Sequence, residues 1–218
     1  MDIDDKTLQA NVLEELKWEP SVNPAKIGVT VRNGIVTLTG HVESYAEKIA
    51  ADRAARRVIG VKAIAQEVEV QLPTTHRRTD EDIAGATVRA LEWDVSVPQD
   101  RVQVEVENGW VVLRGEVDWQ YQRQAAEDDV RRLTGVVGVT NHVKIKPAVS
   151  PSGIRERIEQ AFKRNAEVDA GKITISTVGY KVILGGKVTA WSEREMAERA
   201  AWSAPGVTEV EDRITVGF

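Results

Sequence analysis

Three histidines are the side chains best suited to acid–base or metal chemistry, and they are far apart in the sequence. They are His41, His76 and His142. An imidazole acts as a base or a metal ligand when other polar side chains converge on it. His41 and His142 fall on outward positions of expected strands, and His76 falls in a linker. We therefore expect surface histidines, with no catalytic residues, no metal ligands and no cofactor.

Motifs for catalysis or nucleotide binding are also missing from the sequence. It contains no G-x-S-x-G, no H-E-x-x-H and no P-loop spacing, and its carboxylates are scattered. There is no cysteine, which excludes disulfides, thiolate metal sites and thiol catalysis. We expect a protein that is not an enzyme and that acts by binding.

Basic residues gather only in short pairs. The formal net charge of −5 argues against nucleic-acid binding, because phosphate contacts need clustered lysine and arginine. The pairs are Arg56–Arg57, Arg77–Arg78 and Arg131–Arg132. The first and third fall at ends of expected helices, where positive charge suits the helix dipole. Alternatively, all three attract anionic phospholipid, at about 1 kcal/mol per basic residue near the surface.

Six tryptophans are many for 218 residues. Trp18 and Trp93 end corresponding helices, and we expect both to pack in the core. Trp110 is an outward position on a strand, and Trp202 lies on a helix. An outward indole packs against a neighbouring unit, which we favour for Trp110 and Trp202, or it meets a partner or a membrane interface.

The elements that position these residues centre on a hairpin that occurs three times. Asn33-Gly34, between alternating apolar residues, predicts a two-residue type I′ turn. Asn108-Gly109 repeats this turn. The third copy has Gly179-Tyr180 instead, which favours a type II′ turn.

Each hairpin is flanked by two helices and a closing strand. In the first copy, apolar spacing predicts a helix over 4–18 and strands over 26–32 and 35–42. A capping box from Ser44 to Glu47 opens a second helix that runs to about residue 59, and a strand follows over 61–70. The fold class is α+β, with tandem α-β-β-α-β units over residues 1–72, 79–147 and 150–218.

Glycines and one polar residue recur inside each unit. Gly40, Gly115 and Gly186 occupy inward strand positions, where a missing side chain would let a helix approach. Gly60, Gly135 and Gly206 end the second helices. Gln66, Asn141 and Asp212 stand at an inward position of the closing strand. Buried polar groups need partners, so we expect hydrogen bonds to main-chain groups of a turn or helix end in the same unit.

These recurring features resemble the BON (bacterial osmoresistance and nodulation) domain over nearly the whole chain. They are V-x-N-G-x-V-x-L-x-G-x-V, a helix ending in Gly-Val, and a closing V-x-N/D-x-[IV]-x-[VI]. The resemblance implies a three-stranded sheet with two helices on one face. It also implies a binding role at phospholipid or envelope surfaces under osmotic stress, without catalysis. The third turn departs from the pattern.

The expected partners are anionic phospholipid surfaces or, alternatively, other proteins that contact the exposed sheet faces in a chaperone-like way. Nucleic acid is not expected, and the oligomeric state is left open. No run is long enough to span a bilayer, and the first residues show no signal peptide. As written the sequence predicts a cytoplasmic protein, or a periplasmic one if a signal peptide has been removed.

Overall fold

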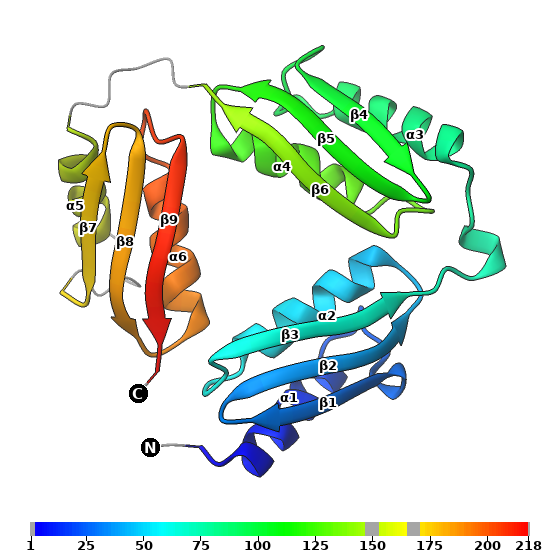
Figure 1. Cartoon of the computed structure of the whole chain (residues 1–218), viewed down its shortest axis with the longest axis horizontal. Coiled ribbons are helices and arrows are strands. Elements are labelled where there is room, and N and C mark those ends of the chain that lie inside the picture. Colours follow the sequence, from blue (N-terminus) through cyan, green and yellow to red (C-terminus); the bar gives the residue numbers. More distant parts are fainter. Residues whose placement is uncertain (1–2, 147–152, 165–170, 218) are drawn as a thin grey trace. The chain divides into compact units, whose positions relative to one another are not determined.

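The computed structural model describes residues 3–146, 153–164 and 171–217, and in them one α-β-β-α-β unit occurs three times (Figure 1). The first unit contains α1 (Asp5–Trp18), β1 (Ile27–Arg32), β2 (Ile35–Val42), α2 (Tyr45–Arg57) and β3 (Ala63–Val70). The second contains α3 (Asp80–Trp93), β4 (Val102–Glu107), β5 (Trp110–Val117), α4 (Gln120–Val130) and β6 (Gly138–Ile145). The third contains α5 (Ile154–Arg164), β7 (Ile173–Val178), β8 (Lys181–Val188), α6 (Trp191–Trp202) and β9 (Glu209–Val216). Short 3₁₀ turns cover Pro24–Lys26 (η1) and Thr74–His76 (η2). The α+β class and the repeated unit are confirmed, whereas linker residues 147–152 lie outside the described residues.

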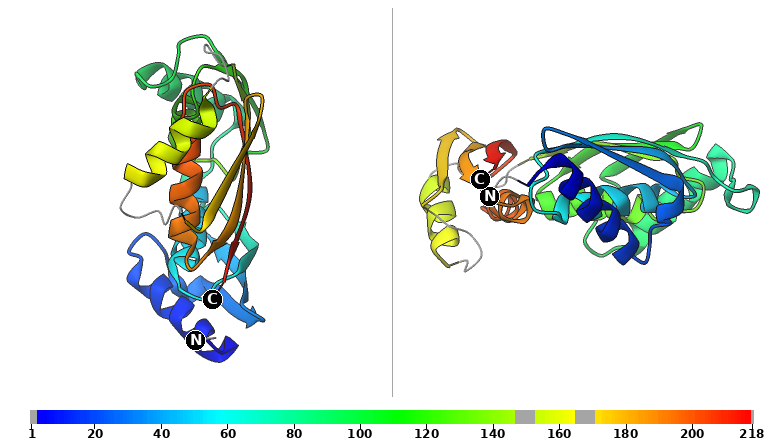
Figure 2. Two further views of the ribbon diagram at one scale, coloured as in Figure 1. Left: turned by 90° about the vertical axis from the view of Figure 1, so that its left-hand side faces the viewer. Right: turned by 90° about the horizontal axis from the view of Figure 1, so that it is seen from below.

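Each unit has one three-stranded sheet with its hairpin's return strand in the centre. The strand orders are β1-β2-β3, β4-β5-β6 and β7-β8-β9. The hairpin strands pair antiparallel, and the closing strand pairs parallel to the central strand in the second and third units. Both helices of a unit lie on the same face of its sheet, as Figure 2 shows for α5 and α6. The other face of each sheet is not covered by the unit's own helices.

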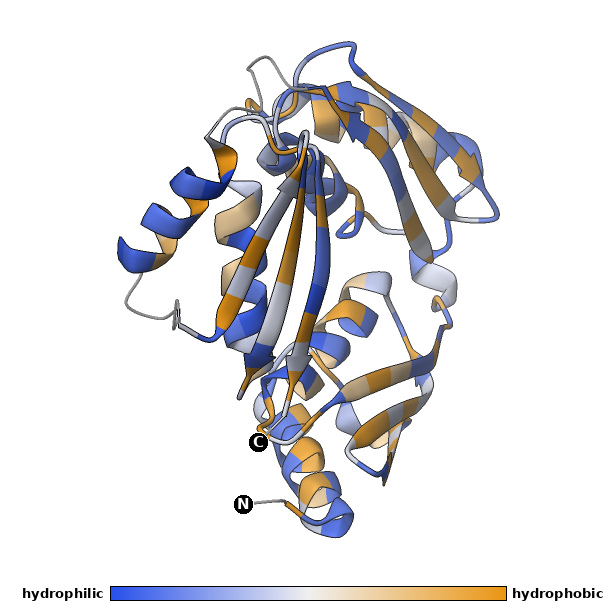
Figure 3. Cartoon of the chain, turned by 60° about the vertical axis from the view of Figure 1, so that its left-hand side comes forward, coloured by the Kyte–Doolittle hydropathy of each residue, from blue (hydrophilic) through white to orange (hydrophobic). Residues whose placement is uncertain are grey.

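The core of each unit lies between its sheet and its helices. Hydropathy alternates along the strands (Figure 3), as expected when one face is buried and the other is not. The central strands bury corresponding residues, which are Val36, Leu38 and Val42, then Val111, Leu113 and Val117, then Val182, Leu184 and Val188. The first helices bury Leu8, Val12 and Leu16, then Ile83, Thr87 and Leu91, then Ile154, Ile158 and Phe162. The second helices bury mainly alanine, which lets them pack close to the sheet.

Backbone angles at the hairpin turns agree with the predicted turn types. Asn33 and Gly34 have φ angles of 54° and 78°, and Asn108 and Gly109 have 51° and 77°. Positive φ at both central residues is the mark of a type I′ turn. In the third turn Gly179 has a φ of 60°, whereas Tyr180 is not among the residues with positive φ. That combination suits a type II′ turn.

The strand glycines are required for a different reason from the one expected. Gly40, Gly115 and Gly186 have φ angles of 105°, 140° and 123°. A Cβ at these positions would lie 2.1, 2.0 and 2.1 Å from the main-chain oxygens of Lys26, Arg101 and Lys172. The obstacle is therefore the backbone just before the neighbouring strand, together with the positive φ angle. The expectation that these glycines let a helix approach is wrong.

Candidate functional site

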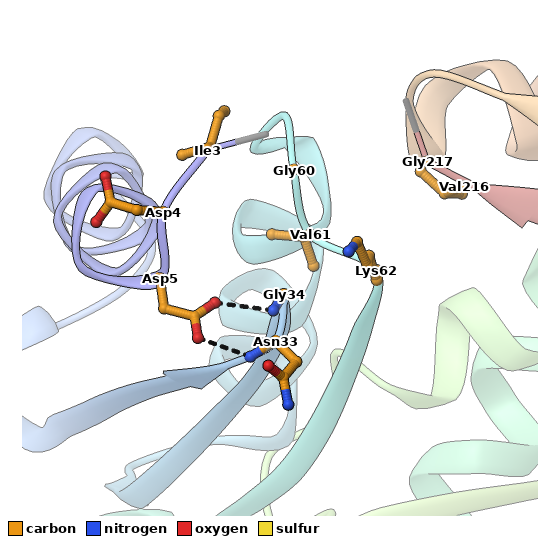
Figure 4. A pocket seen from close by; sticks show the side chains of 10 residues that line it. All are labelled: Ile3, Asp4, Asp5, Asn33, Gly34, Gly60, Val61, Lys62, Val216 and Gly217. Atoms are coloured by element: carbon orange, nitrogen blue, oxygen red, sulfur yellow. Dashed lines mark hydrogen bonds between the residues drawn. The ribbon is translucent and has the colours of Figure 1, made fainter. Parts of the chain in front are cut away.

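An aspartate at the start of the first helix holds the hairpin turn in the first two units. The Asp5 carboxylate accepts hydrogen bonds from the main-chain N–H groups of Asn33 (2.7 Å) and Gly34 (2.9 Å), as Figure 4 shows. Asp80 accepts the corresponding bonds from Asn108 and Gly109, both at 2.8 Å. The corresponding residue of the third unit is Pro151, which lies outside the described residues. These turns are thus structural, and Asp5 and Asp80 are contacts that the sequence reasoning missed.

The polar residue on the closing strand is also held within its own unit. Asn141 Nδ2 donates to the main-chain oxygen of Arg123 in α4 at 2.9 Å, and Asn141 Oδ1 accepts from the N–H of Val143 at 3.1 Å. The bond goes to a main-chain group of the same unit, as expected, but Arg123 is the fourth residue of α4 and not a helix end. Asp212 instead forms an ion pair with Arg194 of α6 and accepts from the N–H of Ile214 at 2.8 Å.

The corresponding residue of the first unit, Gln66, is held by weaker hydrogen bonding. Gln66 Oε1 accepts from the N–H of Val68 at 3.3 Å, while its Nε2 is buried and finds no partner among the described residues. In all three units the side-chain oxygen therefore accepts from the N–H two residues later. This local bond fixes the course of the closing strand and leaves little of the side chain for a ligand.

Ion pairs inside the units occupy three of the arginines that were candidates for lipid contact. Arg56 pairs with Asp52 at 2.6 Å. Arg57 bridges from α2 to Glu15 and Glu19, at 2.8 and 3.0 Å. Carboxylates already placed at these distances compete with a phosphate for the same guanidinium.

The third such arginine, Arg131, is only 8% exposed. It pairs with Asp128 at 2.6 Å and with Glu127 at 3.3 Å. Arg132, Arg77 and Arg78 are exposed. Arg78 donates to the main-chain oxygens of Thr75 and Arg77, which stiffens the linker.

The two tryptophans that end α1 and α3 are almost completely exposed. Trp18 is 83% exposed and Trp93 is 86% exposed, and the neighbouring Val95 is fully exposed. The expectation that both indoles pack in the core is wrong. Each follows a buried leucine by two residues, Leu16 and Leu91. Two residues correspond to about 200° around a helix, which turns the indole away from the core, so this signal was present in the sequence.

The other two candidate tryptophans are held within their own units. Trp110 lies on β5, 48% exposed, and its Nε1 donates to Thr140 Oγ1 of β6 at 2.8 Å. A Cβ added to Gly138 would lie 2.4 Å from the Trp110 ring, so the indole rests directly on that glycine. Trp202 is partly buried and packs against the core of the third unit.

Two carboxyl groups meet at the carboxyl ends of α3 and α4. Asp94 is the residue that follows α3, and Asp129 lies in the last turn of α4. Burial raises the pKa of Asp129 to about 6, and the nearby charge of Asp94 and a hydrogen bond with it act in the same direction. The hydrogen bond from the main chain of Ser96, at 2.7 Å, lowers the pKa of Asp94. Nothing in the sequence indicated this pair, because the two residues are distant in the chain.

The histidines lie where the sequence places them. His76 and His142 are exposed, and His41 is partly exposed. Within the described residues, no three His, Asp or Glu side chains gather closely enough to hold a metal ion. None of the helices in that part of the chain combines the length and the apolar character needed to cross a membrane.

Comparisons with known proteins agree with this repeated architecture. The family model of the BON domain matches residues 4–71, 79–147 and 151–217. Over 150 residues the chain is 31% identical to osmotically-inducible protein Y of Escherichia coli K12, covering 66% of this chain and 74% of that protein. A solved structure of CdsD, a structural protein of the type III secretion system of Chlamydia trachomatis, is 14% identical. The match covers 95% of this chain and 91% of that one, with a TM-score of 0.27. The chain belongs to the BON domain family and carries three copies of that domain.

Proposed function

We propose that this chain is a non-enzymatic, osmotic-stress-related protein that binds anionic phospholipid surfaces peripherally. The relation to stress is supported by the BON family and by the similarity to osmotically-inducible protein Y. The observation that carries the lipid contact is the exposure of Trp18 and Trp93, at equivalent helix ends. An indole is stabilised at the boundary between headgroups and acyl chains, where its apolar body and its N–H are both accommodated.

The second unit suits an anionic surface better than the first. Arg89 lies one helical turn before Trp93 and is exposed, so a cation and an indole share one side of α3. In the first unit the corresponding residue is Glu14, which pairs with Lys17 at 2.6 Å. We therefore assign the larger contribution to Trp93, Val95 and Arg89. Arg77 and Arg78 in the exposed linker add to the attraction.

Co-sedimentation with vesicles tests this function. Wild-type protein should sediment with vesicles that contain phosphatidylglycerol and remain in solution with vesicles of phosphatidylcholine. Trp93→Ser should weaken binding by at least about tenfold, equivalent to about 1.4 kcal/mol, and Trp18→Ser should weaken it less. Trp110→Ser is the matched control, because it removes an exposed indole from a sheet instead. Equal binding by wild type and a Trp18→Ser/Trp93→Ser variant would contradict the proposal.

A second candidate function is protein binding through the open face of a sheet. The observation in its favour is that the Trp110 ring rests against Gly138 with its N–H already bonded to Thr140. Because the indole is already held in place, a partner that covers it would not reduce the freedom of the Trp110 side chain and would not break its hydrogen bond.

An aggregation assay separates the two functions. If the sheet face binds polypeptides, the protein should reduce light scattering by chemically denatured citrate synthase during refolding. Trp110→Ser should remove that effect, while Trp93→Ser should retain it. Loss of the effect in Trp93→Ser alone would contradict binding through the sheet face.

A further inference from the structure

The carboxyl groups of Asp94 and Asp129 are arranged to share one proton. Asp129 Oδ2 is buried and finds no hydrogen-bond partner among the described residues. An ionised carboxylate accepts hydrogen bonds only, whereas a protonated one also has an O–H to donate. Protonation of Asp129 therefore supplies a donor to Asp94, and it relieves the repulsion between two adjacent negative charges.

The charged groups around this pair do not cancel its charge. Arg132 favours the ionised form of Asp129, but its effect on the pKa is smaller than the effects of burial and of the nearby Asp94. The charge of Asp128 raises this pKa further. Arg131 is already paired with Asp128 and Glu127. Both carboxyl groups also lie at the negative end of a helix dipole. The pKa of Asp129 is thereby raised to about 6, so the proton is bound at pH 5 and released by pH 7.5.

The pair lies beside the surface to which we assign the lipid contact. Asp94 stands between Trp93 and Val95 in the chain, and both of these side chains are exposed. At pH 7.5 the pair carries two negative charges next to that surface, whereas at pH 5 it carries one. We propose that mild acidification strengthens the attachment of the second BON unit to anionic phospholipid by protonating the Asp94–Asp129 pair. This inference rests on the proposed phospholipid-binding function and adds its regulation.

The first unit has no such pair of carboxyl groups and therefore provides an internal comparison. Its residue equivalent to Asp129 is Ala54, which is fully buried, and that of the third unit is Ala200. Glu19 corresponds to Asp94, and it is held by Arg57 at 3.0 Å rather than by a second carboxyl group. Any contact through Trp18 should therefore be insensitive to pH between 5 and 7.5.

The test is co-sedimentation of the full chain with phosphatidylglycerol vesicles at pH 5 and pH 7.5. Removal of one negative charge near an anionic surface contributes about as much as one added basic residue, so wild-type affinity should rise about fivefold on acidification. In the Asp129→Asn variant the side chain at this position is neutral at both pH values. The variant should bind at pH 7.5 as wild type does at pH 5, and its affinity should change little with pH. Melting temperatures at both pH values show that each variant is folded.

Controls separate the sources of a pH effect. His76 is an exposed imidazole beside Arg77 and Arg78, so His76→Gln is measured alone and together with Asp129→Asn. A wild-type pH effect that persists unchanged in Asp129→Asn would overturn the inference. Binding that depends on Trp93 but not on pH would overturn it while leaving the phospholipid function intact. No binding at either pH would overturn both.

Discussion

Asn141 on β6 donates a hydrogen bond from Nδ2 to the main-chain oxygen of Arg123 on α4, at 2.9 Å. The bond joins the closing strand of the second unit to the helix that covers it. Asn141→Leu would leave that oxygen and the N–H of Val143 without their partner, so we expect it to cost about 1–3 kcal/mol of the free energy of unfolding. Urea denaturation measures the cost. His142→Leu, an outward change on the same strand, is the control and should cost much less. An Asn141→Leu protein that keeps its stability but loses vesicle binding would make this position a ligand site.

The carboxylate of Asp80 accepts from two main-chain N–H groups of the turn at Asn108 and Gly109. Asp80→Asn removes the charge and one of the two acceptors. We expect a loss of about 1–3 kcal/mol in the free energy of unfolding, since hydrogen bonds to a charged group are stronger than neutral ones. Glu81→Gln, the adjacent exposed acid, is the matched control. If both changes cost the same, the turn does not depend on Asp80.

Gly115 has a φ angle of 140°, and a Cβ there would lie 2.0 Å from the main-chain oxygen of Arg101. Even Gly115→Ala should therefore destabilise the second unit by at least about 3 kcal/mol, through backbone strain and overpacking. In contrast, Gly85→Ala in α3 should stabilise it by about 0.5–1 kcal/mol, because its Cβ would approach only the end of the Arg89 side chain. Thermal melts that show no loss for Gly115→Ala would refute this account of the strand glycines.

The raised pKa of Asp129 makes stability depend on pH in a defined direction. The folded protein binds this proton up to about pH 6, whereas the unfolded chain releases it near 3.8. The folded state therefore loses relative stability as pH rises from about 4 to 6, by up to about 3 kcal/mol, and this contribution is constant above that range. Asp129→Ala, which reproduces the residue at Ala54, should remove this contribution and be more stable than wild type at pH 7.5. Urea denaturation at pH 4.5 and pH 7.5 measures the free energy of unfolding of both proteins. The same change in this free energy with pH in wild type and Asp129→Ala would contradict the prediction.

Much of the fold could be predicted from local sequence patterns. The turn at Asn33-Gly34 and the alternation along β2 required only the chemistry of neighbouring residues, and repetition reinforced both. The structural role of Asn141 followed from its inward position among apolar residues. The bond from Asp5 to the turn at Asn33 could not be predicted in this way, because it joins residues 28 positions apart in the sequence.

The interaction surfaces were harder to predict than the fold. Trp18 and Trp93 were expected in the core because they end corresponding helices, although their spacing from Leu16 and Leu91 turns them outward. The ion pair between Arg57 and Glu15 and the carboxyl pair of Asp94 and Asp129 depend on helix packing. Composition and spacing alone do not reveal which charges such packing brings together.

The central claim is that the indoles at the helix ends, and not those on the sheet or within a core, contact phospholipid. The most direct test is ¹⁹F NMR of protein labelled with 5-fluorotryptophan, with signals assigned by single Trp→Phe variants. On addition of phosphatidylglycerol vesicles, the signals of Trp93 and Trp18 should broaden and shift, whereas those of Trp110 and Trp202 should stay unchanged. Changes at Trp110 or Trp202, with Trp93 and Trp18 unaffected, would contradict the account.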